Sequence, residues 1–218
     1  MQIVALQARA ETTRRRIIDS AVELFAEMGY GETGLADVLQ RAGVSKGAFY
    51  YHFDSKEAVA TAIIEEFGSA AGRAADAEFD ANSPTLEGLI AVTYAVQALM
   101  HNDKLTQVGH RLCQALDQVS RAGAQVYLGW TDRFPDMVKK VIEGGEMLDG
   151  VDPNDVAESV WMGILGCNLA SAAIGDDPYA RLGRCWRVMV RSIVPESSLT
   201  AAHGAVDRVA ERYERIPV

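Results

Sequence analysis

A short stretch of the sequence places one lysine, two small residues and three ring-bearing side chains within seven positions. Lysine neutralises a phosphate or approaches a guanine edge, glycine lets a backbone come close to a ligand, and alanine contacts a thymine methyl group. Tyrosine and histidine carry polar groups that reach phosphate oxygens. These residues are Lys46, Gly47, Ala48, Tyr50, Tyr51 and His52. Their types and spacing favour contact with a nucleic acid over an inert surface.

Two short helical patterns position these side chains. The first runs from about Leu35 to Ala42 and stops at Gly43, and Ser45 is a good N-cap for the second. Apolar residues beneath them can form a small core: Val38, Val44, Phe49 and Phe53. Two short helices joined by a tight turn that contains glycine describe a helix-turn-helix, here over residues 35–52. From spacing alone, an ordinary helical hairpin remains the alternative.

Helical periodicity continues along nearly the whole chain, and no segment alternates as a half-buried strand would. A long helix is predicted from Lys56 through Phe67 and past Gly72. Further helices are predicted near residues 11–28, 85–101, 104–119, 122–144, 154–174, 179–194 and 198–214. The sequence therefore predicts an all-α protein. The 154–174 pattern is apolar around most of its circumference, so this helix needs cover on two sides. We expect a second copy of the chain to supply part of that cover, through the 154–174 and 179–194 helices of a homodimer.

Composition excludes several classes. The chain has 218 residues, 49% of them hydrophobic, and a net charge of −9, which is globular composition rather than that of a disordered chain. No uninterrupted apolar run approaches the roughly 20 residues of a membrane helix, and the N-terminus lacks the basic region of a signal peptide. Three widely spaced cysteines fit a reducing compartment. These features predict a cytoplasmic protein without a membrane segment.

The acidic chain has one basic end. Within the first 16 residues, four arginines face one acidic residue, Glu11: these are Arg9, Arg14, Arg15 and Arg16. A protein with this charge distribution binds a polyanion only through that end.

Signals for catalysis and metal binding are weak. Residues 43–47 match the G-x-S-x-G pattern of a hydrolase nucleophile elbow, but a helical pattern precedes Ser45 where the elbow requires a strand. The four histidines show no i, i+4 pairing and no cysteine at ligand spacing. We therefore predict no enzyme activity, no cofactor and no metal.

The segment Val44–Phe53, followed by Ser55, Lys56 and Glu57, resembles the DNA-binding domain of the TetR family of transcriptional regulators. The resemblance implies a homodimer with a three-helix DNA-binding domain, placed here at residues 9–54, and a larger helical domain for ligand binding and dimerisation at residues 55–214. It assigns operator contact to Lys46, Gly47, Tyr50, Tyr51 and His52, and phosphate contact to Lys56 and Thr33. Gly34 departs from the usual Thr or Ser and offers no hydroxyl to a phosphate.

The second half of the chain is similar to the γ-butyrolactone receptor branch of that family. The similarity runs through Gly129-Trp130-Thr131-Asp132 and the 138–148 segment, and it implies that Trp130 lines the ligand pocket. A single tryptophan is often plain core, so that alternative stays open, as it does for Trp161 and for Trp186, which we place at the subunit interface. Weaker candidates for the pocket lining are Tyr94, Gln97, Cys167 and Asn168.

Pro135 interrupts the helix that this branch would have beside Trp130. Proline has no N–H to donate to the carbonyl of Thr131, and its ring disfavours a straight helix. We therefore predict a kink or a helix start there, with the Thr131 carbonyl available to a ligand.

These features together predict a repressor that binds a pseudo-palindromic operator in double-stranded DNA as a dimer and is released by a small signalling molecule of the γ-butyrolactone, butenolide or furan type. The alternative is a regulator of the same fold for a drug, a lipid or an acyl thioester, and an enzyme is a distant third.

Overall fold

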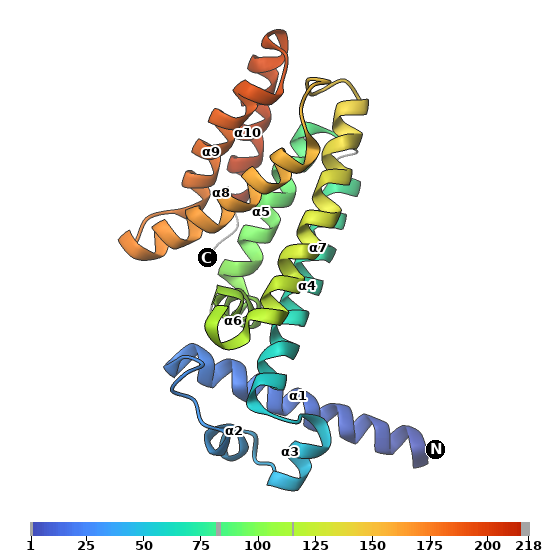
Figure 1. Ribbon diagram of the computed structural model, residues 1–218, viewed down its shortest axis with the longest axis vertical. Coiled ribbons are helices and arrows are strands. Elements are labelled where there is room, and N and C mark those ends of the chain that lie inside the picture. The colour runs from blue at the N-terminus through green and yellow to red at the C-terminus, as the bar shows by residue number, and fades with distance from the viewer. Residues whose placement is uncertain (1, 82–83, 115, 215–218) are drawn as a thin grey trace. The chain divides into compact units, whose positions relative to one another are not determined.

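The computed structural model describes the backbone of residues 2–81, 84–114 and 116–214, and the side chains of residues 7–79, 84–114, 123–126, 128–130 and 132–214. Within these ranges the chain contains helices and no strand, which confirms the all-α prediction (Figure 1). The elements are α1 (Gln2–Met28), α2 (Leu35–Ala42), α3 (Lys46–His52), α4 (Lys56–Ala81), α5 (Leu86–Asn102), α6 (Lys104–Gln114), α7 (Leu116–Glu143), α8 (Pro153–Ile174), α9 (Pro178–Ile193), the 3-10 turn η1 (Glu196–Ser198) and α10 (Leu199–Glu214).

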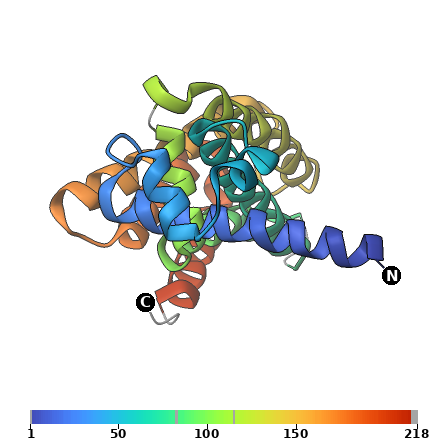
Figure 2. The same cartoon turned by 90° about the horizontal axis from the view of Figure 1, so that it is seen from below.

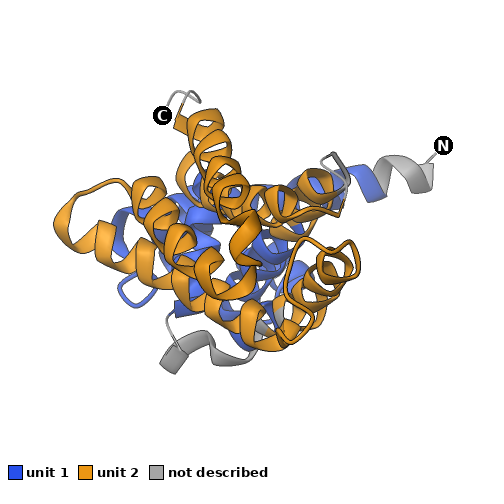
Figure 3. Ribbon diagram, turned by 90° about the horizontal axis from the view of Figure 1, so that it is seen from above, with its two compact units in different colours: residues 1–69, 103–126 blue, residues 70–102, 127–218 orange. Residues whose placement is uncertain are grey.

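The chain divides into two compact units (Figure 3). Unit 1 comprises residues 1–69 and 103–126, and unit 2 comprises residues 70–102 and 127–218. The division falls inside α4 and inside α7, so each of these helices contributes to both units. The predicted domain boundary at residues 54 and 55 therefore remains a prediction.

Unit 1 has an apolar core beneath the helix-turn-helix. The stripe of α1 that the 3.6-residue period predicts is buried, with Ile17 and Ile18 fully covered. It packs with residues of α2, α3, α4 and α6 in one cluster, including Val38, Phe49 and Ile63. The N-terminal part of α1 projects past α2 and α3 (Figures 1 and 2). The helix starts at Gln2 rather than near residue 11, because residues 2–10 are mostly good helix formers.

A glycine explains a second misplaced boundary. The break predicted near residue 120 is absent, because α7 runs without interruption from Leu116 to Glu143. Gly123 does not end a helix. A Cβ there would lie 3.0 Å from the Cys113 carbonyl oxygen, so the bare glycine lets α7 pack closely on the end of α6.

Unit 2 is built around α5, which is buried on nearly all of its circumference. α10 and α9 pack on α5 and on one another, and α8 packs on α9. Trp186 of α9 is 1% exposed within its own chain, and its indole N–H donates to the Thr93 hydroxyl at 2.9 Å. The prediction that Trp186 lies at a subunit interface is therefore wrong, because this side chain is already covered inside unit 2.

One of the described helices, α8, is long and apolar enough to cross a membrane by length and composition alone. The sequence analysis missed it, because charged residues interrupt the apolar run without outweighing it. Only 28% of the apolar window is buried within the chain. The uncovered apolar residues on α8 and α9 include Met162 at 50%, Leu169 at 68% and Val188 at 72% exposure.

Candidate nucleic-acid interface and ligand site

The short helix α3 is anchored by its aromatic inner face. Phe49 is fully buried and Phe53 is 6% exposed, and their ring centroids lie 6.0 Å apart. The Ser45 hydroxyl caps the helix by accepting the Ala48 N–H at 3.2 Å, and α2 ends at Gly43 with φ of 60°. The turn chemistry and the buried rings together fix which side of α3 faces outward.

The opposite face of α3 carries the residues that sequence analysis assigned to DNA. Tyr51 is 76% exposed and Tyr50 46%, while Lys46 and Gly47 are also exposed. The Lys46 ammonium lies 5.9 Å from the centre of the Tyr50 ring. Ala48 and His52 are half-buried, and the His52 ring meets Tyr51 edge to face at 4.9 Å. The structure thus brings all six residues of this segment onto one short helix.

Gly47 has no internal reason to be glycine. A Cβ added there would meet only the Ser45 hydroxyl, at 4.0 Å, and the residue is helical. Glycine inside a helix costs about 1 kcal/mol relative to alanine. The open side at this position suits close approach by an external molecule.

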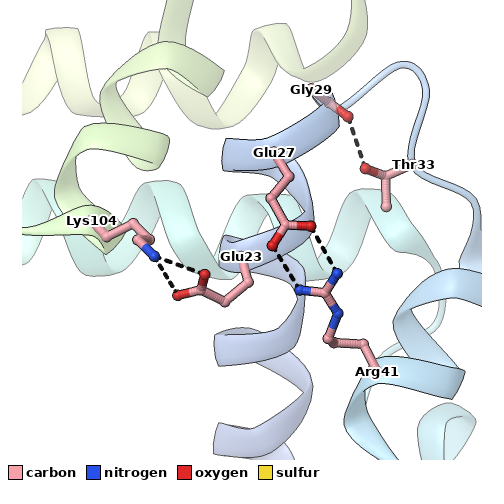
Figure 4. Close-up of polar contacts among 6 residues, drawn as sticks. All are labelled: Glu23, Glu27, Gly29, Thr33, Arg41 and Lys104. Atoms are coloured by element: carbon pink, nitrogen blue, oxygen red, sulfur yellow. Dashed lines mark hydrogen bonds and ion pairs between the residues drawn. The ribbon is translucent and has the colours of Figure 1, made fainter.

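Two ion pairs attach neighbouring helices to α1 (Figure 4). Arg41 at the end of α2 donates to both carboxylate oxygens of Glu27, at 2.8 and 2.9 Å. Lys104 of α6 donates to both oxygens of Glu23, at 2.7 and 2.8 Å. The bidentate Arg41 contact fixes the orientation of α2 on α1. Sequence analysis missed this pair, although an arginine in the last turn of α2 was its visible signal.

The structure corrects the role assigned to Thr33. Its side chain is 1% exposed, and its hydroxyl donates to the Gly29 carbonyl at 2.8 Å (Figure 4). A hydroxyl held inside the turn is not presented to a phosphate. At Gly34, the backbone N–H instead donates to the Asp37 carboxylate at 2.8 Å, which starts α2 without a hydroxyl.

Lys56 also has partners within its own chain. Its ammonium donates to the carbonyl oxygens of Tyr30 and Thr33, at 2.8 and 2.7 Å, and lies 4.2 Å from the centre of the Tyr30 ring. Lys56 therefore ties the start of α4 to the loop between α1 and α2. These contacts position the helix-turn-helix, and the phosphate contact of Lys56 remains a prediction.

The basic end of α1 is only partly available. Arg15 pairs with Asp19 and Glu66, each at 2.8 Å, and the Arg14 guanidinium lies 5.3 Å from the centre of the Phe53 ring. Arg9 and Arg16 are exposed. These two are the arginines of the first 16 residues best placed to meet a polyanion.

Trp130 belongs to an aromatic cluster in unit 2. It is half-buried and stacks on Phe134 with centroids 4.5 Å apart and planes 15° apart, and the Trp161 ring lies 5.3 Å away. Its indole N–H donates to the Ala157 carbonyl at 3.4 Å, a long hydrogen bond. The three rings form an aromatic cluster of the kind that lines apolar ligand sites.

The helix does not start beside Trp130. α7 continues through Pro135, so that part of the prediction is wrong. The buried neighbours Phe134, Met137 and Val138 hold the turn in place, and packing outweighs the single backbone hydrogen bond that proline removes. The predicted contact between the Thr131 carbonyl and a ligand remains a prediction, and the Thr131 side chain lies outside the described residues.

The weaker pocket candidates all have partners inside unit 2. Gln97 is fully buried and exchanges two hydrogen bonds with Asn168, at 2.9 and 2.7 Å. Tyr94 is also fully buried, and its hydroxyl donates to the Tyr179 carbonyl at 3.3 Å; burial raises its pKa to about 12. Cys167 contacts Cys185. Each residue has a structural role that does not require a ligand.

Two further features of unit 2 were missed by sequence analysis. A groove of about 530 Å³ lies between the start of α5 and α10, lined by residues that include Glu87, Glu146 and Arg208. On α4, a Cβ at Gly72 would lie 2.8 Å from the Arg133 guanidinium, which pairs with Asp76 at 2.9 Å. Gly72 thus makes room for an arginine of α7.

Among the residues described, no group of three His, Cys, Asp or Glu side chains is arranged to hold a metal.

An outward aromatic and basic face on the second helix of a helix-turn-helix, in a chain that also has a larger helical unit, is typical of a DNA-binding regulator. Residues 17–63 match the family model of bacterial regulatory proteins of the tetR family. The A-factor receptor protein of Streptomyces griseus is 29% identical over 216 residues, which are 97% of this chain and 75% of that protein. Residues 17–63 of this chain therefore carry a DNA-binding domain of the TetR family.

Solved structures agree over nearly the whole chain. A γ-butyrolactone receptor described as an ArpA-like protein superposes with a TM-score of 0.77 at 26% identity, covering 94% of this chain and 99% of that one. CprB from Streptomyces coelicolor, in complex with its operator sequence, gives a TM-score of 0.74 at 25% identity, covering 91% of this chain and 98% of that one. These relatives are regulators and receptors rather than enzymes.

Proposed function

We propose that this protein is a ligand-responsive transcriptional repressor that binds a pseudo-palindromic operator as a homodimer. The observation that carries the proposal is the outward face of α3, where exposed Lys46, Gly47, Tyr50 and Tyr51 stand on the buried Phe49. The N-terminal residues of a recognition helix contact base edges in the major groove. Lys46 and Gly47 occupy that end of α3, and the tyrosines suit the flanking phosphates.

A twofold dimer presents two such helices to two half-sites. We place the dimer interface on α8 and α9, where Met162, Leu169 and Val188 leave large apolar surfaces uncovered. Gly163 and Gly166 of α8 support this assignment, because a Cβ at either would meet nothing within 4 Å of its own chain. Their helix-weakening effect is consistent with close approach by a second copy.

We assign the effector to the γ-butyrolactone, butenolide or furan class, with Trp130 as a wall of the pocket. The long similarity to proteins described as A-factor and γ-butyrolactone receptors supports this class. The aromatic cluster of Trp130, Phe134 and Trp161 fits a small, mostly apolar ring. An effector that binds one dimer arrangement better than another weakens operator binding by that difference in affinity.

The net charge of −9 limits where DNA can bind. Acidic surface away from α3 and the start of α1 repels phosphate, so we expect weak non-specific DNA binding. We also propose that the protein acts in the cytoplasm, as expected for a regulator that binds bacterial promoter DNA.

A gel-shift assay with DNA from the protein's own promoter region, with and without candidate butyrolactones, tests the proposal. We expect a shifted complex that a butyrolactone abolishes for wild type. Trp130→Ala should retain the complex and lose the response. Failure of every lactone, with release by a drug, lipid or acyl thioester, would assign the effector to the alternative class. Failure to bind the promoter DNA would contradict the repressor assignment.

A further inference from the structure

Two cysteines of unit 2 lie against each other. The Cys167 sulfur on α8 and the Cys185 sulfur on α9 are 3.7 Å apart, although 18 positions separate them in the chain. Cys167 is 4% exposed and Cys185 is half-buried. Both are free thiols.

The connection between α8 and α9 holds the thiols in contact. Gly175 ends α8 with φ of 70°, and the Asp177 carboxylate caps α9 by accepting the Tyr179 N–H at 2.8 Å. Arg181 pairs with Asp176 at 2.7 Å across the same turn. A short turn with a cap on each side restricts the motion of the two helices, so the sulfurs remain near one another.

The two thiols differ in ways that suit sequential oxidation. Burial, and then the neighbouring Cys185, raise the pKa of Cys167 to about 12, so Cys167 remains protonated at neutral pH. Cys185 is the more accessible of the pair. An oxidant from solvent therefore meets Cys185 first, and Cys167 is in position to resolve the product.

We propose that Cys167 and Cys185 form a peroxide-sensitive dithiol that closes to an intrachain disulfide between α8 and α9. The Cys185 thiolate attacks one peroxide oxygen, breaks the O–O bond and becomes a sulfenic acid, while the other oxygen leaves as hydroxide and takes up a proton. The Cys167 sulfur then attacks the Cys185 sulfur and displaces water. Two thiols and one hydrogen peroxide thus give one disulfide and two waters, after the sulfurs approach from 3.7 Å to about 2.0 Å.

Cys113 is an internal control. It lies on α6 in unit 1, and burial raises the pKa of its thiol to about 12. It is half-buried like Cys185, and its pKa is raised as that of Cys167 is, but the described residues give it no cysteine partner. If proximity drives the reaction, Cys113 stays a thiol while the pair is oxidised.

The experiment treats the folded, full-length protein with hydrogen peroxide, alkylates the remaining thiols and maps tryptic peptides by mass. Cleavage after Arg181, Arg184 and Arg187 puts Cys167 on the 141–181 peptide and Cys185 on the 185–187 peptide. We expect a disulfide to join these two peptides and dithiothreitol to separate them. The joined peptide should form at least about tenfold faster than the Cys113 thiol ceases to react with the alkylating agent. Cys113→Ser should not change the result, whereas Cys167→Ala or Cys185→Ala should abolish the joined peptide.

Absence of the joined peptide from oxidised wild type would overturn the proposal. So would a disulfide between two chains, or loss of all three thiols at equal rates. Formation of the disulfide does not depend on the proposed function. Its expected effect on dimer dissociation does, because that effect requires the proposed dimer interface. If α8 and α9 form the interface, the oxidised protein should show a changed dimer dissociation constant by sedimentation. If the disulfide forms in a protein that is not a dimer, this result contradicts the proposed interface, and the dithiol proposal still stands.

Discussion

The recognition helix and the ligand-binding unit use their polar residues in opposite ways. On α3, Lys46, Tyr50 and Tyr51 are exposed, and the structural work is done by Phe49 and Phe53 underneath. In unit 2, the polar candidates are engaged internally. The Gln97 amide hydrogen-bonds to Asn168, the Tyr94 hydroxyl donates to the Tyr179 carbonyl, and Cys167 contacts Cys185. On α3, function and stability are thus carried by separate residues, whereas the polar candidates of unit 2 serve stability.

This difference explains why function is easier to infer at the DNA-binding end. An exposed polar residue on a well-anchored helix is free to serve a partner, so its type reports on that partner. A buried polar residue must be satisfied first by its own chain. Its type therefore reports mainly on internal packing.

The largest expected effect is on the free energy of unfolding, and it distinguishes the inner face of α3 from the outer face. Phe49→Ala removes a fully buried ring and should lower the free energy of unfolding by about 3–5 kcal/mol. Tyr51→Ala, at a 76% exposed position, should change it by less than about 0.5 kcal/mol. Urea unfolding followed by circular dichroism measures both, and equal losses would contradict the division of roles.

A buried histidine gives unit 1 a pH dependence. His110 is 8% exposed, and burial followed by the charge of Arg111 lowers its pKa from 6.5 to about 4. Between those pH values the unfolded chain binds the proton and the folded chain does not. Stability is therefore intact above about pH 6.5 and falls as the pH drops toward 4, by about 3 kcal/mol in total. Urea unfolding across this range should show the loss, and His110→Gln should show less of it.

The amide pair tests whether unit 2 residues serve structure before ligand. Asn168→Leu leaves the fully buried Gln97 amide without its partner, and Gln97→Leu does the same to the half-buried Asn168 amide. Each change should cost about 1–3 kcal/mol of stability. The double variant should cost less than the sum of the two, because no partner is left behind. Additive costs in thermal unfolding would indicate that the two amides act independently. If the double variant still responds to a butyrolactone, the pair lies outside the pocket.

Two lysines of unit 1 give the finest comparison. Lys46→Ala should reduce the slope of log affinity against log salt concentration by about one, if Lys46 neutralises a phosphate. Lys56→Met should lower stability, because it removes two hydrogen bonds to loop carbonyls, and should leave the slope unchanged. Anisotropy titrations of a promoter fragment at several salt concentrations measure the slope. A loss confined to one operator base would instead make Lys46 a base reader.

Much of unit 1 could be predicted from the sequence, because turn and cap residues act locally. Gly43, Ser45 and the spacing of Phe49 and Phe53 were enough to locate α2 and α3. The roles of Thr33 and Lys56 were not predictable, because each depends on a backbone carbonyl supplied by the loop after α1. In unit 2, the continuity of α7 through Pro135 and the burial of Trp186 depend on packing between distant segments. Local propensity does not contain that information.

The most direct measurement is a titration of a labelled fragment of the protein's own promoter with wild type and with Tyr51→Ala, followed by fluorescence anisotropy to saturation. The account predicts two chains bound per operator and an affinity at least about tenfold weaker for Tyr51→Ala, with its stability unchanged. One chain per operator, or equal affinities for the two proteins, would contradict the claim that the outer face of α3 reads DNA from a dimer.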